Sequence, residues 1–302
     1  MTGPTRATVA GRVYLDLQNK ARREQRPTQE LLELYVLEGF LARLAEGNDR
    51  DTLVLKGGVL LAAYGTRRAT RDVDFLATEL DNDRDVVLQL CSRIAGAERN
   101  DGLDFDFGSA RAELIRDDDE YSGVRVSMRC ELARAQISFH IDVKVGDPVW
   151  PAPGMVEVPA LLGGSIRLLG YPITAVHAEK VVTAIQRGTA NTRWRDFADI
   201  YLLNAQQDVD GDNLIRALTE VAIHRGAQLI VLRETLQGYP ELAQTRWTAW
   251  VRRQTLIDRL PGEFGELLES VYAFADPAIR ADVAGHRWDH LSQSWRSTDQ
   301  HP

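Results

Sequence analysis

The sequence is poor in cysteine, in long apolar runs and in positive charge, and each shortage excludes a class of protein. Two cysteines, Cys91 and Cys130, are too few for a disulfide framework and suit a reducing compartment. No apolar run reaches the roughly 18 residues of a membrane-spanning helix. The 36 Lys and Arg residues against 44 Asp and Glu give a net charge of −8, so nucleic acid can be bound only through a local basic patch.

The start of the chain gives no sign of export. Residues Met1 to Arg6 lack the apolar core of a signal peptide. Together with the low cysteine content, this predicts a soluble, cytoplasmic protein that has no membrane partner.

The chain is long enough for two packed lobes. It has 302 residues, 44% of them hydrophobic. Strand-like segments alternate with helical ones up to the stretch Gly146–Pro172, whose five prolines and several glycines are typical of a connection between lobes. We therefore expect a mixed α/β lobe with N-terminal helices over residues 1–165 and an all-helical lobe over residues 166–302.

The most informative motif is a pair of aspartates, Asp72 and Asp74, within a segment that reads as a strand over Arg71–Ala77. On a strand, residues i and i+2 point to the same face, so both carboxylates project together while Val73 points the other way. Two such charges roughly 4 Å apart repel by about 4 kcal/mol at an effective dielectric near 20. A fold that keeps this pair either exposes it to water or supplies a cation.

A glycine pair precedes the aspartates. Lys56-Gly57-Gly58 follows a short buried strand and leads into a helical segment. Glycines at such a turn let backbone N–H groups approach a phosphate, and the start of the helix favours its charge. A simple tight turn explains the same residues, so the phosphate interpretation depends on the neighbouring acids.

A second strand predicted near Gln136–Val145 contributes a third acid. Its alternation places His140, Asp142 and Lys144 on the polar face. If this strand neighbours the Asp72 strand, three carboxylates share one face and suit Mg²⁺, which prefers oxygen ligands and substrate phosphate. A solvated strand aspartate remains the alternative for Asp142, and the oxygen-rich set does not indicate zinc.

The expected helical lobe begins with charged helices. In the predicted helix Thr174–Arg187, Lys180 and Arg187 are seven residues apart and therefore lie on one face. They form either a solvated stripe or a cationic surface for phosphate. Asp196 lies in the first turn of the next predicted helix, Trp194–Ala205, where the helix dipole favours a negative charge. Its carboxylate could also hold Lys180 or Arg195 in position.

Short motifs, in their order along the chain, resemble those of a known family. They are Lys56-Gly57-Gly58, Asp72-Val73-Asp74, Ile141-Asp142, and the pair Ala178-Glu179-Lys180 with Arg193-Trp194-Arg195-Asp196. From about Thr28 to Leu203 the chain resembles the AbiEii/AbiGii-type nucleotidyltransferase toxins, which include the MenT toxins of mycobacteria.

The resemblance implies a fold and an active site. It implies an α+β architecture, with a DNA-polymerase-β-like nucleotidyltransferase lobe built on a mixed sheet and a helical lobe after it. Asp72 and Asp74 match the metal-binding pair, and Lys180 and Asp196 match an essential lysine and aspartate. The glycines match the turn that binds the nucleotide phosphates. The implied cofactor is Mg²⁺ or Mn²⁺.

The resemblance also implies a substrate and partners. Characterised mycobacterial members transfer nucleotides, with a pyrimidine preference, to the 3′ end of tRNA and so block aminoacylation. The expected substrates are therefore an NTP, CTP or UTP in particular, and the tRNA acceptor end. A cognate antitoxin from the adjacent gene and a monomeric state are also expected. Thr70 occupies the place of a hydroxyl residue that one antitoxin type phosphorylates, where a phosphate would add about −1.5 to −2 charge beside the acids.

Three arginines just before the acids, Arg67, Arg68 and Arg71, are candidates for the local RNA-binding patch, although a solvated loop explains them equally well. Two alternative functions remain open. One is transfer to a small molecule or a protein side chain. The other is a nucleotide-binding module without turnover.

Overall fold

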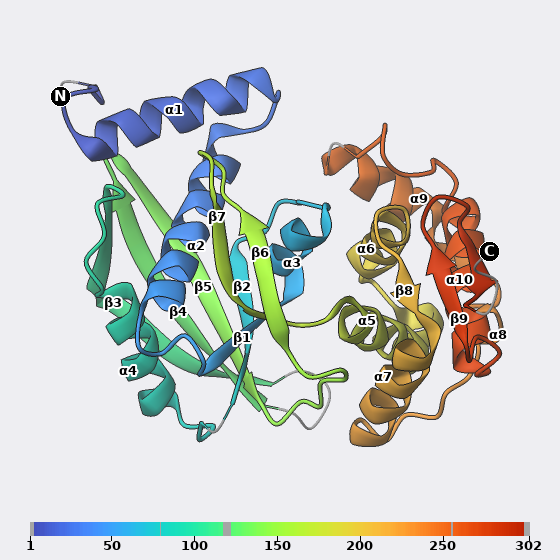
Figure 1. Cartoon of the computed structure of the whole chain (residues 1–302). Coiled ribbons are helices and arrows are strands. Elements are labelled where there is room, and N and C mark those ends of the chain that lie inside the picture. The colour runs from blue at the N-terminus through green and yellow to red at the C-terminus, as the bar shows by residue number, and fades with distance from the viewer. Residues whose placement is uncertain (1–2, 79, 117–121, 255, 299–302) are drawn as a thin grey trace. The chain divides into compact units, whose positions relative to one another are not determined.

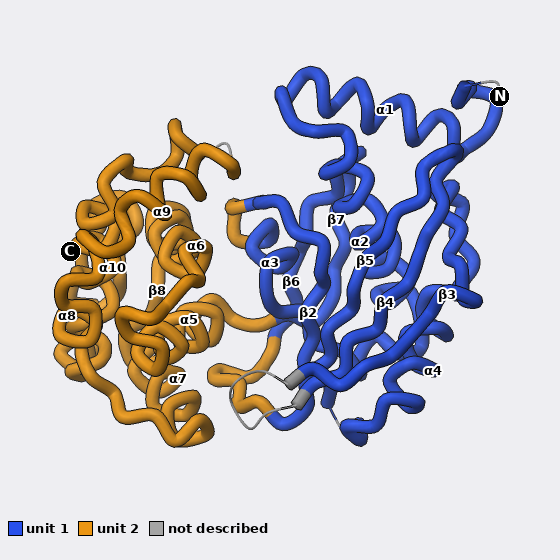
Figure 2. Tube along the Cα trace, turned by 180° about the vertical axis from the view of Figure 1, so that it is seen from behind, with its two compact units in different colours: residues 1–63, 67–146, 154–170 blue, residues 64–66, 147–153, 171–302 orange. Residues whose placement is uncertain are grey.

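The computed structural model describes residues 3–78, 80–116, 122–254 and 256–298. Its chain forms two compact units (Figure 2). The first unit comprises residues 1–63, 67–146 and 154–170, and the second comprises residues 64–66, 147–153 and 171–302. The expected boundary between the two lobes at residue 165 stays a prediction.

The first unit is built on a seven-stranded mixed sheet with the order β3-β4-β5-β2-β1-β7-β6. Its strands are β1 (Leu53–Lys56), β2 (Asp72–Ala77), β3 (Leu103–Arg116), β4 (Ser122–Leu132), β5 (Ala135–Val145), β6 (Gly154–Pro159) and β7 (Ser165–Gly170). Two neighbouring pairs, β2 with β5 and β1 with β7, are parallel, and the other pairs are antiparallel.

Helices cover one face of this sheet. Figure 1 shows α2 and α4 lying across it. The helical elements of the unit are α1 (Val9–Arg23), α2 (Thr28–Glu46), α3 (Gly57–Leu60), the 3₁₀ turn η1 (Leu61–Tyr64) and α4 (Arg84–Ala95). Phe40 of α2 packs against Phe75 of β2 and Phe139 of β5, with ring centroids 6.1 and 6.5 Å apart. This packing buries the apolar side of both strands, which leaves their polar side chains on the opposite face.

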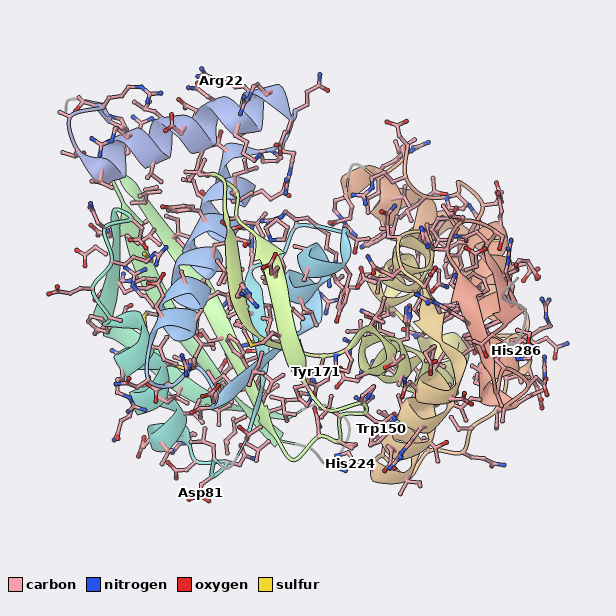
Figure 3. The ribbon with its side chains drawn as sticks, viewed as in Figure 1. Arg22, Asp81, Trp150, Tyr171, His224 and His286 are labelled. Carbon is pink, nitrogen blue, oxygen red and sulfur yellow. The ribbon has the colours of Figure 1, made fainter. Side chains whose placement is uncertain are left out.

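The second unit is mostly helical. Its helical elements are α5 (Ile173–Arg187), the 3₁₀ turn η2 (Gly188–Ala190), α6 (Trp194–Asn204), α7 (Gly211–His224), α8 (Leu232–Thr235), α9 (Tyr239–Arg253) and α10 (Phe264–Ile279). Its core contains Phe197, Trp247 and Phe274, all fully buried. Figure 3 labels Trp150 and also His224, the last residue of α7. Trp150 packs under the guanidinium of Arg216, 3.4 Å from the ring centroid, so the segment 147–153 belongs to this unit.

The α+β class is confirmed, but one detail of the prediction is wrong. The second unit is not all-helical, since it contains a three-stranded antiparallel sheet. The strands are β8 (Val209–Asp210), β9 (His286–Asp289) and β10 (Ser294–Ser297). Strands of two to four residues are too short to show an alternating pattern in the sequence. Trp288 of β9 is nonetheless buried, and its indole N–H donates to the carbonyl of Asn204 at 3.0 Å.

The stretch Gly146–Pro172, expected to be a connection, also contains regular structure. Residues 154–170 form the β6–β7 hairpin, and β7 pairs with β1 through Leu55 and Gly170. Gly170 has no space for a side chain, because a Cβ there would lie 2.6 Å from the side chain of Val156. This glycine therefore serves close packing within the sheet, although in the sequence it resembles a breaker.

Among the described residues, no helix has both the length and the apolar composition that crossing a membrane requires. Both cysteines are free and buried.

Candidate active site

The aspartate pair lies where the sequence predicts it. Asp72 and Asp74 are half-buried on strand β2, while Val73 and Phe75 between and after them are fully buried. The two carboxylates therefore share the face of the sheet opposite α2. The predicted same-face arrangement is confirmed.

Strand β5 is the parallel neighbour of β2, which confirms the expected adjacency. Asp142 lies directly opposite Asp74 in the register, and His140 lies opposite Asp72. Directly opposite residues on paired strands point to the same face, so Asp142 joins the pair on one surface. The His140 ring shares a hydrogen bond of 2.9 Å with the hydroxyl of Ser127 on β4, in keeping with a hydrogen-bonded strand histidine.

Asp142 has a cationic partner that sequence reasoning missed. Arg125 of β4 lies opposite Asp142 and donates from Nε and Nη2 to its two carboxylate oxygens, at 2.8 and 2.7 Å. The hydrogen bond to Asp142 raises the pKa of Arg125 further above its ordinary value, against the effect of burial. In the sequence Arg125 is one of several charged residues of an alternating strand, and only the strand register selects it.

The turn after β1 brings the backbone against one of the acids. Gly57 has φ +67°, and a Cβ at this position would lie 1.9 Å from Oδ2 of Asp74. Both the positive φ and the close approach require glycine. Lys56 is buried at the end of β1, opposite Asp74 in the register, and the guanidinium of Arg68 lies 3.0 to 3.1 Å from the Cβ position of Gly58. The first unit thus brings the predicted Lys56-Gly57-Gly58 turn and the acids together.

The arginines proposed for RNA binding have different surroundings. Arg67 is turned inward, donating to Glu38 at 2.5 Å and to the carbonyl of Pro159. Arg71 is 71% exposed and pairs with Glu33 at 3.1 Å. Only the exposed Arg71 clearly faces solvent, so the RNA-binding role of these residues stays a prediction.

Thr70 lies immediately beside the acids. It is half-buried, and its hydroxyl donates to the backbone carbonyl of Asp72 at 3.1 Å.

In the second unit, Lys180 of α5 bridges two acids of α6. Its Nζ donates to Asp196 at 3.0 Å and to Asp199 at 2.7 Å. The expectation that Asp196 holds Lys180 is therefore confirmed, and Asp199 is an addition. Asp199 follows Asp196 by three residues in a helical segment, and this spacing indicates that both acids lie on the same side of the helix. Arg187 lies half-buried in the last turn of α5.

The charges around Asp196 keep it ionised. Burial opposes ionisation, but Lys180, Arg193 and Arg195 outweigh it and lower the pKa of Asp196 to about 2. Arg193 contributes through Nε, which lies 2.7 Å from Oδ2 of Asp196. Lys180 is thus fixed in position by two buried carboxylates, with only 12% of its side chain exposed.

The residues that would hold a metal are Asp72 and Asp74, with Asp142 as the third candidate. Two carboxylates on one strand face, beside a glycine turn that leaves no room for a side chain, fit a hard divalent cation. Asp142 fits less directly, because both of its oxygens already accept from Arg125.

A second group of possible metal ligands lies in the second unit. Among the described residues, Asp208, Asp289 and His290 have ligand atoms within 4.8 Å of one another. Asp208 pairs with His290 at 2.6 Å and with Arg287 at 3.0 Å, and Asp289 pairs with Arg296 at 2.9 Å. These ion pairs account for the cluster without a metal ion.

Comparison with known proteins finds a protein family that matches most of the chain. A family model described as "Nucleotidyl transferase AbiEii toxin, Type IV TA system" matches residues 39–281. No curated protein matches the chain. Among solved structures, a proposed nucleotidyltransferase from H. pylori is 15% identical, with a TM-score of 0.48, over 84% of this chain and 96% of its own. JHP933 from Helicobacter pylori is 15% identical, with a TM-score of 0.36, over 77% and 97%.

Proposed function

Because the chain belongs to the AbiEii family of nucleotidyl transferase toxins, we propose that it adds a nucleoside monophosphate from an NTP to the 3′ end of tRNA. Such an addition blocks aminoacylation and hence translation. CTP and UTP are the proposed donors. The family is that of a type IV toxin–antitoxin system, which implies a cognate antitoxin as partner.

The proposed reaction is a single displacement at phosphorus. The oxygen of the terminal ribose 3′-hydroxyl forms a bond to the α-phosphorus of the NTP. The bond between the α-phosphorus and the oxygen that bridges to the β-phosphate breaks, and pyrophosphate leaves. The hydroxyl proton passes to solvent or to a nearby base.

One observation carries the proposal: Asp72 and Asp74 share one face of β2, directly beside a glycine turn that only a residue without a side chain can form. Mg²⁺ or Mn²⁺ bound there would supply a positive charge that activates the attacking hydroxyl and stabilises the leaving pyrophosphate. The protein's own part is to hold the two carboxylates together and to present backbone N–H groups at the start of α3. These groups suit the phosphates of the nucleotide.

The cationic residues of the proposal come from the family's motifs and from helix α5. We assign Lys180 and Arg187 to the phosphates of the NTP. Asp196 orients Lys180 through the hydrogen bond of 3.0 Å. Because Asp199 also accepts from Nζ, Lys180 is held in one conformation, which reduces the entropy that binding a phosphate would cost.

The decisive test replaces Asp72 by Asn, which keeps the shape and removes the charge. We expect Asp72→Asn to lower nucleotide incorporation into RNA by about 100-fold or more, and to abolish growth inhibition. The measurement is the transfer of labelled CMP and UMP to total tRNA, with circular dichroism to confirm folding. Asp104→Asn, an exposed aspartate on β3, is the matched control and should keep full activity.

The same assay decides the acceptor. Labelled NTPs are incubated in parallel with RNA, with a protein mixture and with aminoglycoside antibiotics. Label in the protein or the antibiotic, and none in RNA, would replace tRNA by that acceptor. NTP binding without pyrophosphate release would leave only a nucleotide-binding module.

We further propose Thr70 as the site at which an antitoxin phosphorylates the toxin. Its hydroxyl lies beside the Asp72 backbone, so a phosphate would add about −1.5 to −2 charge next to the acids and oppose binding of both metal and NTP. Mass spectrometry after co-expression with the adjacent gene product should find phosphate at Thr70. Its absence from an inactivated toxin would remove this assignment.

A further inference from the structure

Five charged residues form a row across the sheet of the first unit. The strand registers place Glu113 of β3, Arg125 of β4, Asp142 of β5, Asp74 of β2 and Lys56 of β1 side by side. Residues directly opposite one another on paired strands share a face, so all five belong to the face of the acidic pair. For the four on β4, β5, β2 and β1, the sequence neighbours Val126, Ile141, Val73 and Leu55 point the other way and are fully buried.

The two basic residues of this row differ in exposure. Lys56 is buried, with 7% of the residue exposed. The side chain of Arg125 is 31% exposed, although the carboxylate that it contacts is only 12% exposed. Arg125 uses Nε and Nη2 for Asp142, and its Nη1 has no hydrogen-bond partner in the part of the chain that the structure describes. A partly exposed cation with spare donors therefore lies in the same row as Asp74, one of the two acids of the pair.

The pairing with Asp142 fixes the guanidinium without using it up. A bidentate contact between a carboxylate and one edge of the guanidinium restricts the long side chain to one orientation. Because the guanidinium is planar, the directions of its remaining N–H groups are fixed as well, and these groups suit the oxygens of a phosphate. Neighbouring strands lie roughly 4.8 Å apart, so Arg125 is about two strand spacings from Asp74. This distance suits a contact with a part of the substrate other than the reacting atoms.

We propose that Arg125, oriented by Asp142, binds a phosphate group of the substrate, and that Asp142 acts as a positioning residue for this arginine. The inference rests on the function proposed above and deepens it. The phosphate belongs either to the triphosphate of the NTP or to the backbone of the RNA acceptor. These two sources present the same chemistry to a guanidinium.

The test uses four variants of the full chain: Arg125→Gln, Arg125→Lys, Asp142→Asn and the double variant Arg125→Gln/Asp142→Asn. Two direct binding measurements separate the sources of the phosphate. Calorimetric titration with CTP and UTP in the presence of Ca²⁺ reports the triphosphate. Fluorescence anisotropy of a labelled tRNA acceptor-stem RNA reports the backbone. Arg129→Gln, on the same strand and paired with Asp106 at 2.9 Å, is the matched control.

We expect Arg125→Gln to weaken the binding of one of the two substrates by about 10-fold to 100-fold, because a charge-assisted hydrogen bond to phosphate is lost. Arg125→Lys should fall between the wild type and Arg125→Gln, since lysine keeps the charge but not the fork. Loss of CTP and UTP binding assigns the triphosphate, and loss of RNA binding assigns the backbone. Arg129→Gln should bind both as the wild type does.

Asp142→Asn should weaken the binding of the same substrate. The double variant should bind that substrate no worse than Arg125→Gln alone. The Mg²⁺ concentration for half-maximal activity should be unchanged in Asp142→Asn. The double variant also guards against misfolding, because it leaves no buried carboxylate unpaired.

Two outcomes would overturn the inference. One is wild-type binding of both substrates by Arg125→Gln. The other is a Mg²⁺ requirement that is raised in Asp142→Asn and in the double variant but not in Arg125→Gln, which would make Asp142 a metal ligand. Neither is confused with failure of the proposed function: the CTP and UTP titrations do not require an acceptor, whereas a wrong acceptor shows as absent transfer to RNA in the wild type.

Discussion

At the scale of single residues, the site depends on contacts that tolerate little change. Gly57 combines a φ of +67° with a Cβ position 1.9 Å from the Asp74 carboxylate. Its neighbour in space, Asp74, is one of the two acids that the motif singles out. The motif showed from the sequence alone that a turn precedes the acids. That the turn touches one of them depends on the antiparallel pairing of β1 with β2.

Gly57→Ala tests this contact. The substitution meets two penalties: the left-handed backbone conformation costs a side chain about 1–2 kcal/mol, and the methyl group displaces Asp74. A displacement of roughly 1 Å at a reacting group can lower a rate by about 100-fold, so we expect incorporation of labelled nucleotide to fall by that order. Gly164→Ala is the control, with a φ of +78° and no atom within 4 Å of its Cβ position. It should lose stability and keep activity; equal activity in both variants would contradict the role of the turn.

At the scale of elements, helix α5 combines a charged and a buried side. Lys180 is held by α6, while His177, one turn earlier, is completely buried against Phe274 with ring centroids 4.6 Å apart. Neither ring nitrogen of His177 has a hydrogen-bond partner among the described residues. Burial, and to a lesser extent the charge of Lys180, lower the pKa of His177 to about 3.

This histidine makes stability depend on pH. An unfolded histidine binds a proton below its ordinary pKa of 6.5, whereas the folded one stays neutral down to about 3. The free energy of unfolding should therefore fall as the pH drops through this window, by about 2 kcal/mol between pH 7 and pH 5 from His177 alone. His177→Leu should flatten that part of the profile in urea unfolding followed by tryptophan fluorescence. His286→Gln, at a half-buried histidine of β9, is the matched control variant for replacing a histidine. An identical slope in His177→Leu and the wild type would refute the assignment.

At the scale of the whole molecule, the two compact units have separate cores. All six tryptophans of the sequence lie in the second unit. They are Trp150, Trp194, Trp247, Trp250, Trp288 and Trp295. Tryptophan fluorescence therefore reports on the second unit alone, while far-ultraviolet circular dichroism reports on both.

We expect the two units to unfold as separate cooperative systems. Phe139→Ala leaves a cavity beside Phe40 and Phe105 in the first unit, at a cost of about 3–5 kcal/mol. It should lower the urea midpoint measured by circular dichroism and leave the fluorescence midpoint in place. Phe197→Ala removes an equally buried ring from the second unit and should lower the fluorescence midpoint. A fluorescence midpoint that moves with Phe139→Ala would show that the units unfold together.

The sequence by itself determined what depends on neighbours along the chain. The spacing of Asp72 and Asp74 on a strand, and that of Lys180 and Arg187 on a helix, follow from backbone periods that tertiary packing does not change. The tertiary structure alone decided which strands pair and in what register. It selected Arg125 as the partner of Asp142, turned Arg67 toward Glu38, and added the β6–β7 hairpin and the small sheet of the second unit. Those contacts join residues far apart in sequence, and their stability comes from burial and charge pairing summed over the whole fold, which no local pattern records.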